Sequence, residues 1–267
     1  MIELKRHGSY LGLDDNGFVI SKSSNDLIQE KWRPIIKDTI DFYLSKFGDN
    51  LHSVYVRGSV SKGEAIEHIS DLDSFCIIKE DAGEVDTPFS EDFQKVMNEK
   101  YPFCTHVEIS YLAKDKVNEP FPPRKRSVWA ELIKTQSACV YGEDLALEIE
   151  PFELKDMLGH SYFIKKELAD LHGYFIEDRE AGEDLSELCV WITRRVVRSG
   201  YDLVMEKEGK FTRDLYLCWE SFSKYYPDKA DDMKAVLNLA LNPSDNEEVV
   251  MQALDKICPW LVNEIEK

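Results

Sequence analysis

Apolar residues in the first half of the chain either recur every three or four positions or concentrate in short runs rich in β-branched and aromatic residues. The helical spacing predicts helices over residues 25–47 and 88–101, because a helix that buries one face repeats every 3.6 residues. The short apolar runs at 51–56, 72–78 and 105–112 predict strands. Together these elements predict a mixed α/β arrangement around a small sheet.

Further elements are expected before and after this sheet. The turn-forming residues Asp-Asn-Gly at 15–17 lie between apolar residues and predict a hairpin over 10–21. A helix is expected over 127–135. Beyond residue 151 the helical period persists, and the predicted helices span 153–177, 184–207, 213–225, 228–241 and 245–265.

A change in character near residues 141–151 indicates a domain boundary. Ser244 and Glu247 form a capping box, which predicts that the last helix begins beside them. The sequence therefore predicts an α+β protein, with a mixed-sheet domain at 1–150 followed by an all-helical bundle at 151–267.

The composition predicts a cytoplasmic, soluble protein with no membrane partner. The chain has 267 residues, of which 43% are hydrophobic, but no apolar run of about 18 residues that could cross a bilayer. Residues 1–6 lack the apolar stretch of a signal peptide. The six cysteines contain no CxxC pair, so we expect small buried side chains in a reducing compartment.

The formal net charge of −18 at pH 7 is shared equally between residues 1–150 and 151–267. Such a field repels a polyphosphate backbone, so the sequence predicts no nucleic-acid partner. A cationic acceptor would be attracted. Acidity that serves only solubility is the alternative interpretation.

A phosphate-binding turn is predicted directly after the first strand, at Gly58 and Ser59. Glycine lets the backbone approach a phosphate closely, and exposed N–H groups of a turn attract negative charge. Lys62 adds a nearby cation. By itself, a Gly-Ser turn after a strand is a common feature.

Two carboxylates follow this turn, at Asp71 and Asp73. Residues i and i+2 of a strand point to the same face, so the two side chains are expected side by side. Carboxylates that close repel each other unless a cation lies between them, and Mg²⁺ prefers such oxygen ligands. The alternative is that Asp71 caps a turn while Asp73 faces solvent.

Glu108 is a third candidate acid, in a strand-like segment where a carboxylate is unexpected. If its strand neighbours the one that bears Asp71 and Asp73, the three acids converge. Glu108 would then be a metal ligand or the general base for an acceptor hydroxyl. The alternative is a surface glutamate on an edge strand.

These residues resemble the nucleotidyltransferase superfamily, in particular aminoglycoside nucleotidyltransferases of the streptomycin/spectinomycin type. That family has a strand, a Gly-Ser turn, about ten residues, then Asp-apolar-Asp-apolar and a later third acid. Here Gly58-Ser59 and Asp71-Leu72-Asp73 fit, while Ser74 replaces the apolar residue at a position that carries no chemistry. The segment His106–Ser110 is similar to the family segment whose third acid is glutamate.

The resemblance implies a nucleotidyltransferase domain with a five-stranded mixed sheet, ATP as nucleotide donor, and two Mg²⁺ ions at the three acids. It implies ATP contacts from the turn and from Ser70, which precedes the first aspartate. Residues 140–145 look like the family's Tyr-Gly signature at the domain boundary. Residues 209–214 resemble a segment that brings a basic residue to the triphosphate, here Arg213, with Arg195 as a second candidate. A cleft between the two domains is expected.

Three functions are compatible with these residues. The first is transfer of AMP from ATP to a hydroxyl of a small cationic acceptor such as an aminoglycoside. The second is modification of a protein hydroxyl by a toxin-antitoxin type of nucleotidyltransferase, a class that is usually shorter. The third is a non-catalytic nucleotide-binding module, which the intact acid triad disfavours.

Overall fold

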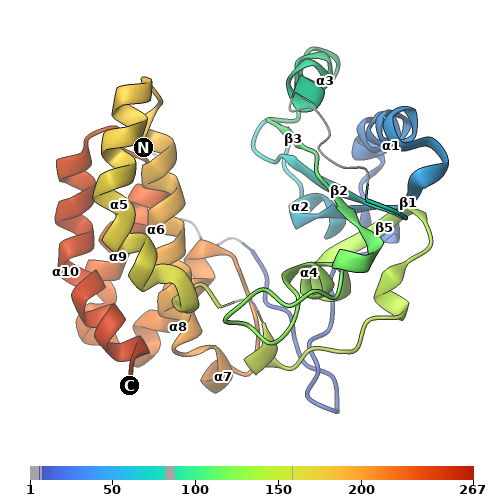
Figure 1. The fold of residues 1–267 in the computed structure, drawn as a ribbon. Helices are drawn as coiled ribbons and strands as arrows, with labels where there is room; N and C mark the ends of the chain where they lie inside the picture. The colour runs from blue at the N-terminus through green and yellow to red at the C-terminus, as the bar shows by residue number, and fades with distance from the viewer. Residues whose placement is uncertain (1–5, 7, 82–87, 158) are drawn as a thin grey trace. The chain divides into compact units, whose positions relative to one another are not determined.

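The computed structural model describes residues 6, 8–81, 88–157 and 159–267, with only the backbone described at 88–91 (Figure 1). The chain divides into two compact units. One unit spans Gly17–Asp156, and the other joins the residues up to Asn16 with Met157–Lys267. The first is called the sheet unit below, and the second is called the helical unit.

The sheet unit contains a five-stranded mixed sheet, as the resemblance implied. Its strands are β1 (Leu51–Arg57), β2 (Leu72–Ile78), β3 (Val107–Glu108), β4 (Tyr111–Ala113) and β5 (Ser137–Gly142). Strand β1 is antiparallel to β2 and to β5, whereas β2 is parallel to β3 and β4. Strand β5 was not expected from the sequence.

Helices cover both faces of this sheet (Figure 1). The helices are α1 (Arg33–Phe47), α2 (Gly58–Ser61), α3 (Pro88–Lys100) and α4 (Val128–Gln136). Ile35 of α1 and Met97 of α3 share one apolar cluster with Leu72 of β2. On the opposite face, the Trp129 ring of α4 lies 5.3 Å from the Phe75 ring of β2. Side chains on both faces of β2 are therefore buried, as expected for a strand with a continuous apolar run.

Three expectations for residues 10–112 were wrong in detail. Residues 10–21, all of which are described, form no hairpin with each other: Leu11 bridges to Phe211 and Phe18 bridges to Glu153. The predicted strand 105–112 is divided into β3 and β4. The expected helix 25–47 begins with two short 3₁₀ turns, and its α-helical part starts at Arg33.

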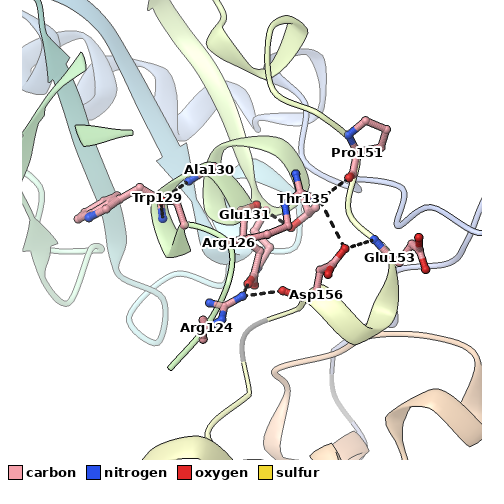
Figure 2. A network of polar contacts seen from close by, with 11 residues as sticks. Arg124, Arg126, Trp129, Ala130, Glu131, Thr135, Pro151, Glu153 and Asp156 are labelled. Atoms are coloured by element: carbon pink, nitrogen blue, oxygen red, sulfur yellow. Dashed lines mark hydrogen bonds and ion pairs between the residues drawn. The ribbon is translucent and has the colours of Figure 1, made fainter. Parts of the chain in front are cut away.

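A buried polar network holds the last residues of the sheet unit against α4 (Figure 2). Arg124 Nη2 lies 2.6 Å from Glu131 Oε2, and the two side chains are 3% and 0% exposed. The same nitrogen donates to the carbonyl of Asp156 at 2.6 Å. Arg126 Nη1 donates to the carbonyl of Pro151, also at 2.6 Å. These charge-assisted bonds fix the chain where it leaves the sheet unit.

The helical unit confirms the predicted bundle. Its helices are α5 (Ser161–Ala181), α6 (Leu185–Asp202), α7 (Met205–Glu208), α8 (Leu215–Tyr225), α9 (Ala230–Leu241) and α10 (Glu247–Ile265). Helix α6 packs against α5, α8, α9 and α10, and is the centre of the bundle. The expected helix 184–207 ends at Asp202 and is followed by the short α7. Among the described helices, none is long and apolar enough to serve as a membrane span.

The N-terminal residues belong to the helical unit, where the sequence predicted them in a 1–150 domain. Leu11 and Phe211 exchange backbone hydrogen bonds of 2.7 and 3.1 Å. The backbone N–H of Ser9 donates to Asp214 Oδ2 at 2.8 Å. These long-range bonds tie the segment to the loop before α8. The boundary on the other side lies at Asp156, six residues after the expected one.

Five of the six cysteines are buried, which confirms the expectation for them. Cys139, on β5, is only half-buried. Burial raises the pKa of the Cys139 thiol to about 11, so it stays protonated at neutral pH. All six thiols are free.

Candidate active site

Three charged residues form a row across neighbouring strands on one face of the sheet. Arg57 is the register partner of Asp73 in the β1–β2 ladder, and Asp73 is the partner of Glu108 in the β2–β3 ladder. Arg57 Nη2 lies 3.1 Å from Asp73 Oδ1 and 2.8 Å from Glu108 Oε2. The sequence left open whether the strand of Glu108 neighbours the strand of Asp73, and in the structure β3 does pair with β2.

Gly58 follows this row directly and packs against it. Its backbone adopts φ +74°, a left-handed conformation that favours glycine. A Cβ atom at this position would lie 2.6 Å from Asp73 Oδ2. Glycine is therefore required twice, for the backbone conformation and for the space that the Asp73 carboxylate occupies.

The bend continues through Ser59, which connects it to the segment before β2. Ser59 Oγ donates to Ser70 Oγ at 3.1 Å, and Ser70 Oγ accepts the backbone N–H of Ile66 at 2.9 Å. Ser70 thus closes the loop between the Gly-Ser turn and Asp71. The loop also contains His68, whose φ of 62° is unusual for a residue other than glycine.

Asp71 immediately precedes β2, and the charge of Asp73 affects its pKa. Asp71 is exposed as a whole residue, but its carboxyl group is partly desolvated by surrounding protein atoms, which raises the pKa of Asp71. The negative charge of Asp73 raises this pKa further. Two hard carboxylate groups that destabilise each other's charge suit a divalent cation such as Mg²⁺. Because Gly58 has no side chain, its backbone can lie close to Asp73 Oδ2.

The three acids do not form a complete metal site by themselves. Within the described part of the chain, no three His, Cys, Asp or Glu side chains stand close enough together to hold a metal ion. The guanidinium of Arg57 contacts Asp73 and Glu108 and supplies the positive charge between them. Metal binding by Asp71, Asp73 and Glu108 stays a prediction, for which the chemistry of the donor groups is suitable.

A buried chain of hydroxyl groups positions the backbone of Glu108. Ser74 Oγ donates to the carbonyl of Glu108 at 2.8 Å, and the Tyr43 hydroxyl lies 3.1 Å from Ser74 Oγ. The backbone N–H of Ser110 donates to the same Tyr43 hydroxyl at 3.2 Å. Burial raises the pKa of Tyr43 well above its usual range. These bonds connect α1 to the junction between β2 and β3.

Three basic residues predicted to contact phosphate lie in different surroundings. Lys62, just after α2, lies 3.6 Å from Glu64. Arg195, on α6, forms a 2.7 Å ion pair with Glu167. Burial raises the pKa of Glu167 above its ordinary value, and the charge of Arg195 offsets part of this increase. The carbonyl of Arg213 accepts a hydrogen bond from Arg198 at 3.2 Å. Phosphate contacts by Lys62, Arg195 and Arg213 remain predictions.

Arg57 and Ser74 are the site residues to which the sequence assigned no role. A charged residue at the end of the apolar run 51–56 was a possible signal for Arg57, but its partners depend on strand register. Ser74 stands where the family pattern has an apolar residue, and was expected to be without chemical consequence. The structure shows that its hydroxyl holds the Glu108 backbone in place.

No protein-family model matches this sequence, and no curated protein matches it. Among solved structures, the chain is similar to the crystal structure of spectinomycin adenyltransferase AAD(9) from Enterococcus faecialis with ATP and spectinomycin. The match covers 87% of this chain and 98% of that chain, with 13% sequence identity and a TM-score of 0.47.

Proposed function

We propose that this protein is a magnesium-dependent nucleotidyltransferase that moves AMP from ATP to a hydroxyl of a small cationic acceptor, such as an aminoglycoside, and releases pyrophosphate. The observation that carries the proposal is the placement of Asp73 and Glu108 side by side in register, next to the left-handed bend at Gly58. Acids at this spacing around a Gly-Ser turn are the pattern through which the sequence resembles nucleotidyltransferases.

In the proposed reaction, the acceptor oxygen attacks the α-phosphorus of ATP and pyrophosphate leaves from the opposite side. Glu108, whose side chain is half-buried, accepts the proton of the attacking hydroxyl. Asp71 and Asp73 would hold Mg²⁺, with Glu108 as a further ligand. When bound, Mg²⁺ supplies positive charge that neutralises the phosphate oxygens.

The residues around the acids are proposed to orient the nucleotide. The backbone at Gly58 and Ser59 offers a narrow bend, which Ser70 braces through its hydroxyl. Lys62 would contribute a cation near the phosphates. Arg195 and Arg213 would contact the triphosphate, as the resemblance implies. Positioning of this kind supplies much of the catalysis in phosphoryl transfer.

The acceptor is proposed to be cationic because of the charge of the chain. A net charge of −18 attracts a polyamine sugar and repels a polyanion. This charge favours a small amine-bearing polyol over a nucleic acid as the second substrate.

The test is a screen for pyrophosphate release with ATP and Mg²⁺, using aminoglycosides, lincosamides and cell extracts as acceptors. Release that requires an aminoglycoside supports the proposal, whereas transfer of label from α-labelled ATP to a protein supports the protein-modifying alternative. Asp73→Asn should abolish turnover while the circular dichroism spectrum is retained, because it removes the metal-binding charge without changing side-chain size. Wild-type turnover by Asp73→Asn contradicts the assignment.

A further inference from the structure

One nitrogen atom of Arg57 serves two acidic side chains at once. Nη2 lies 3.1 Å from Asp73 Oδ1 and 2.8 Å from Glu108 Oε2, although the two acids are on different strands. The arginine side chain is 27% exposed, so its contacts are partly shielded from water. The contact with Glu108 is a charge-assisted hydrogen bond, which is stronger than one between neutral groups, and the contact with Asp73 is an ion pair.

The position of this nitrogen is one that a divalent cation would need. Asp73 and Glu108 are register partners, and like charges directly opposite each other destabilise a sheet. Arg57 offsets that repulsion. A magnesium ion bound to the same oxygens at about 2.0–2.1 Å would occupy the space in which Nη2 lies and would repel the guanidinium. Guanidinium and divalent cation therefore exclude each other.

We propose that Arg57 is a resident counter-ion of Asp73 and Glu108, which a divalent cation must displace before it can bind. The inference rests on the proposed function, because it takes these two acids to be metal ligands. Arg57 is a positioning residue in this scheme. The metal alone binds weakly, and a metal that arrives with a triphosphate binds better because the displaced guanidinium gains an anionic partner.

The first test measures binding of Mn²⁺ without nucleotide, by the electron paramagnetic resonance signal of the free ion. Arg57→Met removes the competing cation and keeps an unbranched side chain. We expect its Mn²⁺ affinity to exceed that of the wild type on the order of tenfold, which corresponds to one charge-assisted hydrogen bond. Arg33→Met is the matched control, because Arg33 pairs with the exposed Glu30 of the same unit. Its Mn²⁺ affinity should equal that of the wild type.

The second test separates counter-ion exchange from a purely structural role. Without metal, Arg57→Met should unfold at a lower temperature than the wild type, because Asp73 and Glu108 repel each other. Mn²⁺ should raise the unfolding temperature of Arg57→Met more than that of the wild type. If Arg57 had only a structural role, Arg57→Met would unfold at a lower temperature than the wild type, and Mn²⁺ would not raise its unfolding temperature more than that of the wild type. Arg57→Lys, which keeps the charge, should bind Mn²⁺ with intermediate affinity and serves if the methionine variant does not fold.

The outcomes distinguish the inference from the proposed function. If the wild type binds Mn²⁺ with ATP but Arg57→Met binds Mn²⁺ alone no more tightly, the counter-ion role is overturned and the transferase proposal stands. If Mn²⁺ binds neither protein, with or without ATP, the metal site is absent and both are overturned. Both proposals are supported if Arg57→Met binds Mn²⁺ more tightly than the wild type and Mn²⁺ raises its unfolding temperature more. Arg33→Met should then behave like the wild type in both measurements.

Discussion

At the scale of single residues, Gly58 is under the tightest steric constraint in the site, and its replacement gives a direct prediction. Gly58→Ala should lower the free energy of unfolding by about 1–2 kcal/mol through its left-handed backbone. It should also displace the Asp73 carboxylate, because the new Cβ would lie 2.6 Å from Oδ2. Turnover and denaturant unfolding are the measurements.

The control for this prediction is Gly17→Ala. Gly17 has φ +86°, but a Cβ there meets nothing within 4 Å. The two variants share the backbone strain and differ in the clash with Asp73. Gly17→Ala should therefore keep full turnover while Gly58→Ala loses it. Equal turnover in both variants would show that the space beside Asp73 is not needed.

Glu108→Gln tests the proposed general base. The amide keeps the size of the side chain and its place beside Asp73, but it cannot accept the proton of the acceptor. We expect kcat to fall on the order of 10²–10⁴-fold, the usual contribution of acid–base catalysis. The affinity for ATP, measured by calorimetry, should change far less. A variant with normal kcat and weakened ATP binding would assign Glu108 to the nucleotide instead.

Residue types and spacing were sufficient to predict Gly58, Asp71, Asp73 and Glu108 as candidates. An aspartate in an apolar strand is unfavourable unless it has a function, and this can be recognised without knowing which residue lies opposite it in the sheet. Arg57 could not be assigned in the same way. Its role depends on which residue lies opposite it in the sheet, and a single sequence does not contain strand register.

At the scale of elements, strand existence was predictable and strand interruption was not. The run 105–112 has the apolar character of one strand, yet β3 ends at Glu108 and β4 begins at Tyr111. The backbone N–H of Ser110 donates to the Tyr43 hydroxyl, a partner contributed by α1. A side chain distant in sequence thus accepts a backbone hydrogen bond between β3 and β4. No local sequence pattern predicts this contact.

The start of α10 shows a similar limit of local reasoning. Ser244 and Glu247 predicted a capping box, but the capping residue is Asn246, whose side chain accepts the N–H of Glu248 at 2.9 Å. Ser244 accepts the N–H of Asn246 instead and forms a turn before the helix. Both residues are good caps, so propensity alone did not choose between them.

Glu247, the first residue of α10, connects that helix to α5. Its carboxylate lies 2.7 Å from Arg179 and 2.7 Å from His172. The hydrogen bond from Arg179, followed by that from His172, lowers the pKa of Glu247 below its ordinary value of 4.5. We predict that Glu247→Gln lowers the free energy of unfolding at pH 7 by about 1 kcal/mol, near the upper end for solvent-accessible pairs.

The pH dependence of this effect has a definite sign. A carboxylate whose pKa is lowered by folding stabilises the protein above its unfolded pKa, and this contribution is lost as pH falls through the folded value. The difference between wild type and Glu247→Gln should therefore be full above about pH 5 and vanish in strong acid, in denaturant unfolding. Glu248→Gln removes a charge from the same helix turn and should show a smaller difference. Equal effects would assign the stabilisation to the helix dipole.

At the scale of the whole molecule, the sequence predicted an α+β unit and a helical bundle but misplaced the N-terminal segment. Leu11 pairs with Phe211, two hundred residues away, and this pairing puts the segment in the helical unit. A turn signal between apolar residues indicates a hairpin only if both sides of the turn pair with each other. Here Phe18 pairs elsewhere, with Glu153.

The charge of the molecule leads to a prediction about its two substrates. A net charge of −18 attracts a cationic acceptor and repels ATP, and salt screens both effects with a Debye length of about 10 Å at 0.1 M. As sodium chloride is raised from about 0.05 to 0.5 M, the KM for an aminoglycoside should rise, and the KM for ATP should stay level or fall. The two substrates thus serve as controls for each other, since a general loss of activity in salt would shift both in the same direction. Parallel increases in both KM values would show that the acidic surface does not select the acceptor, and would favour the interpretation that it serves solubility.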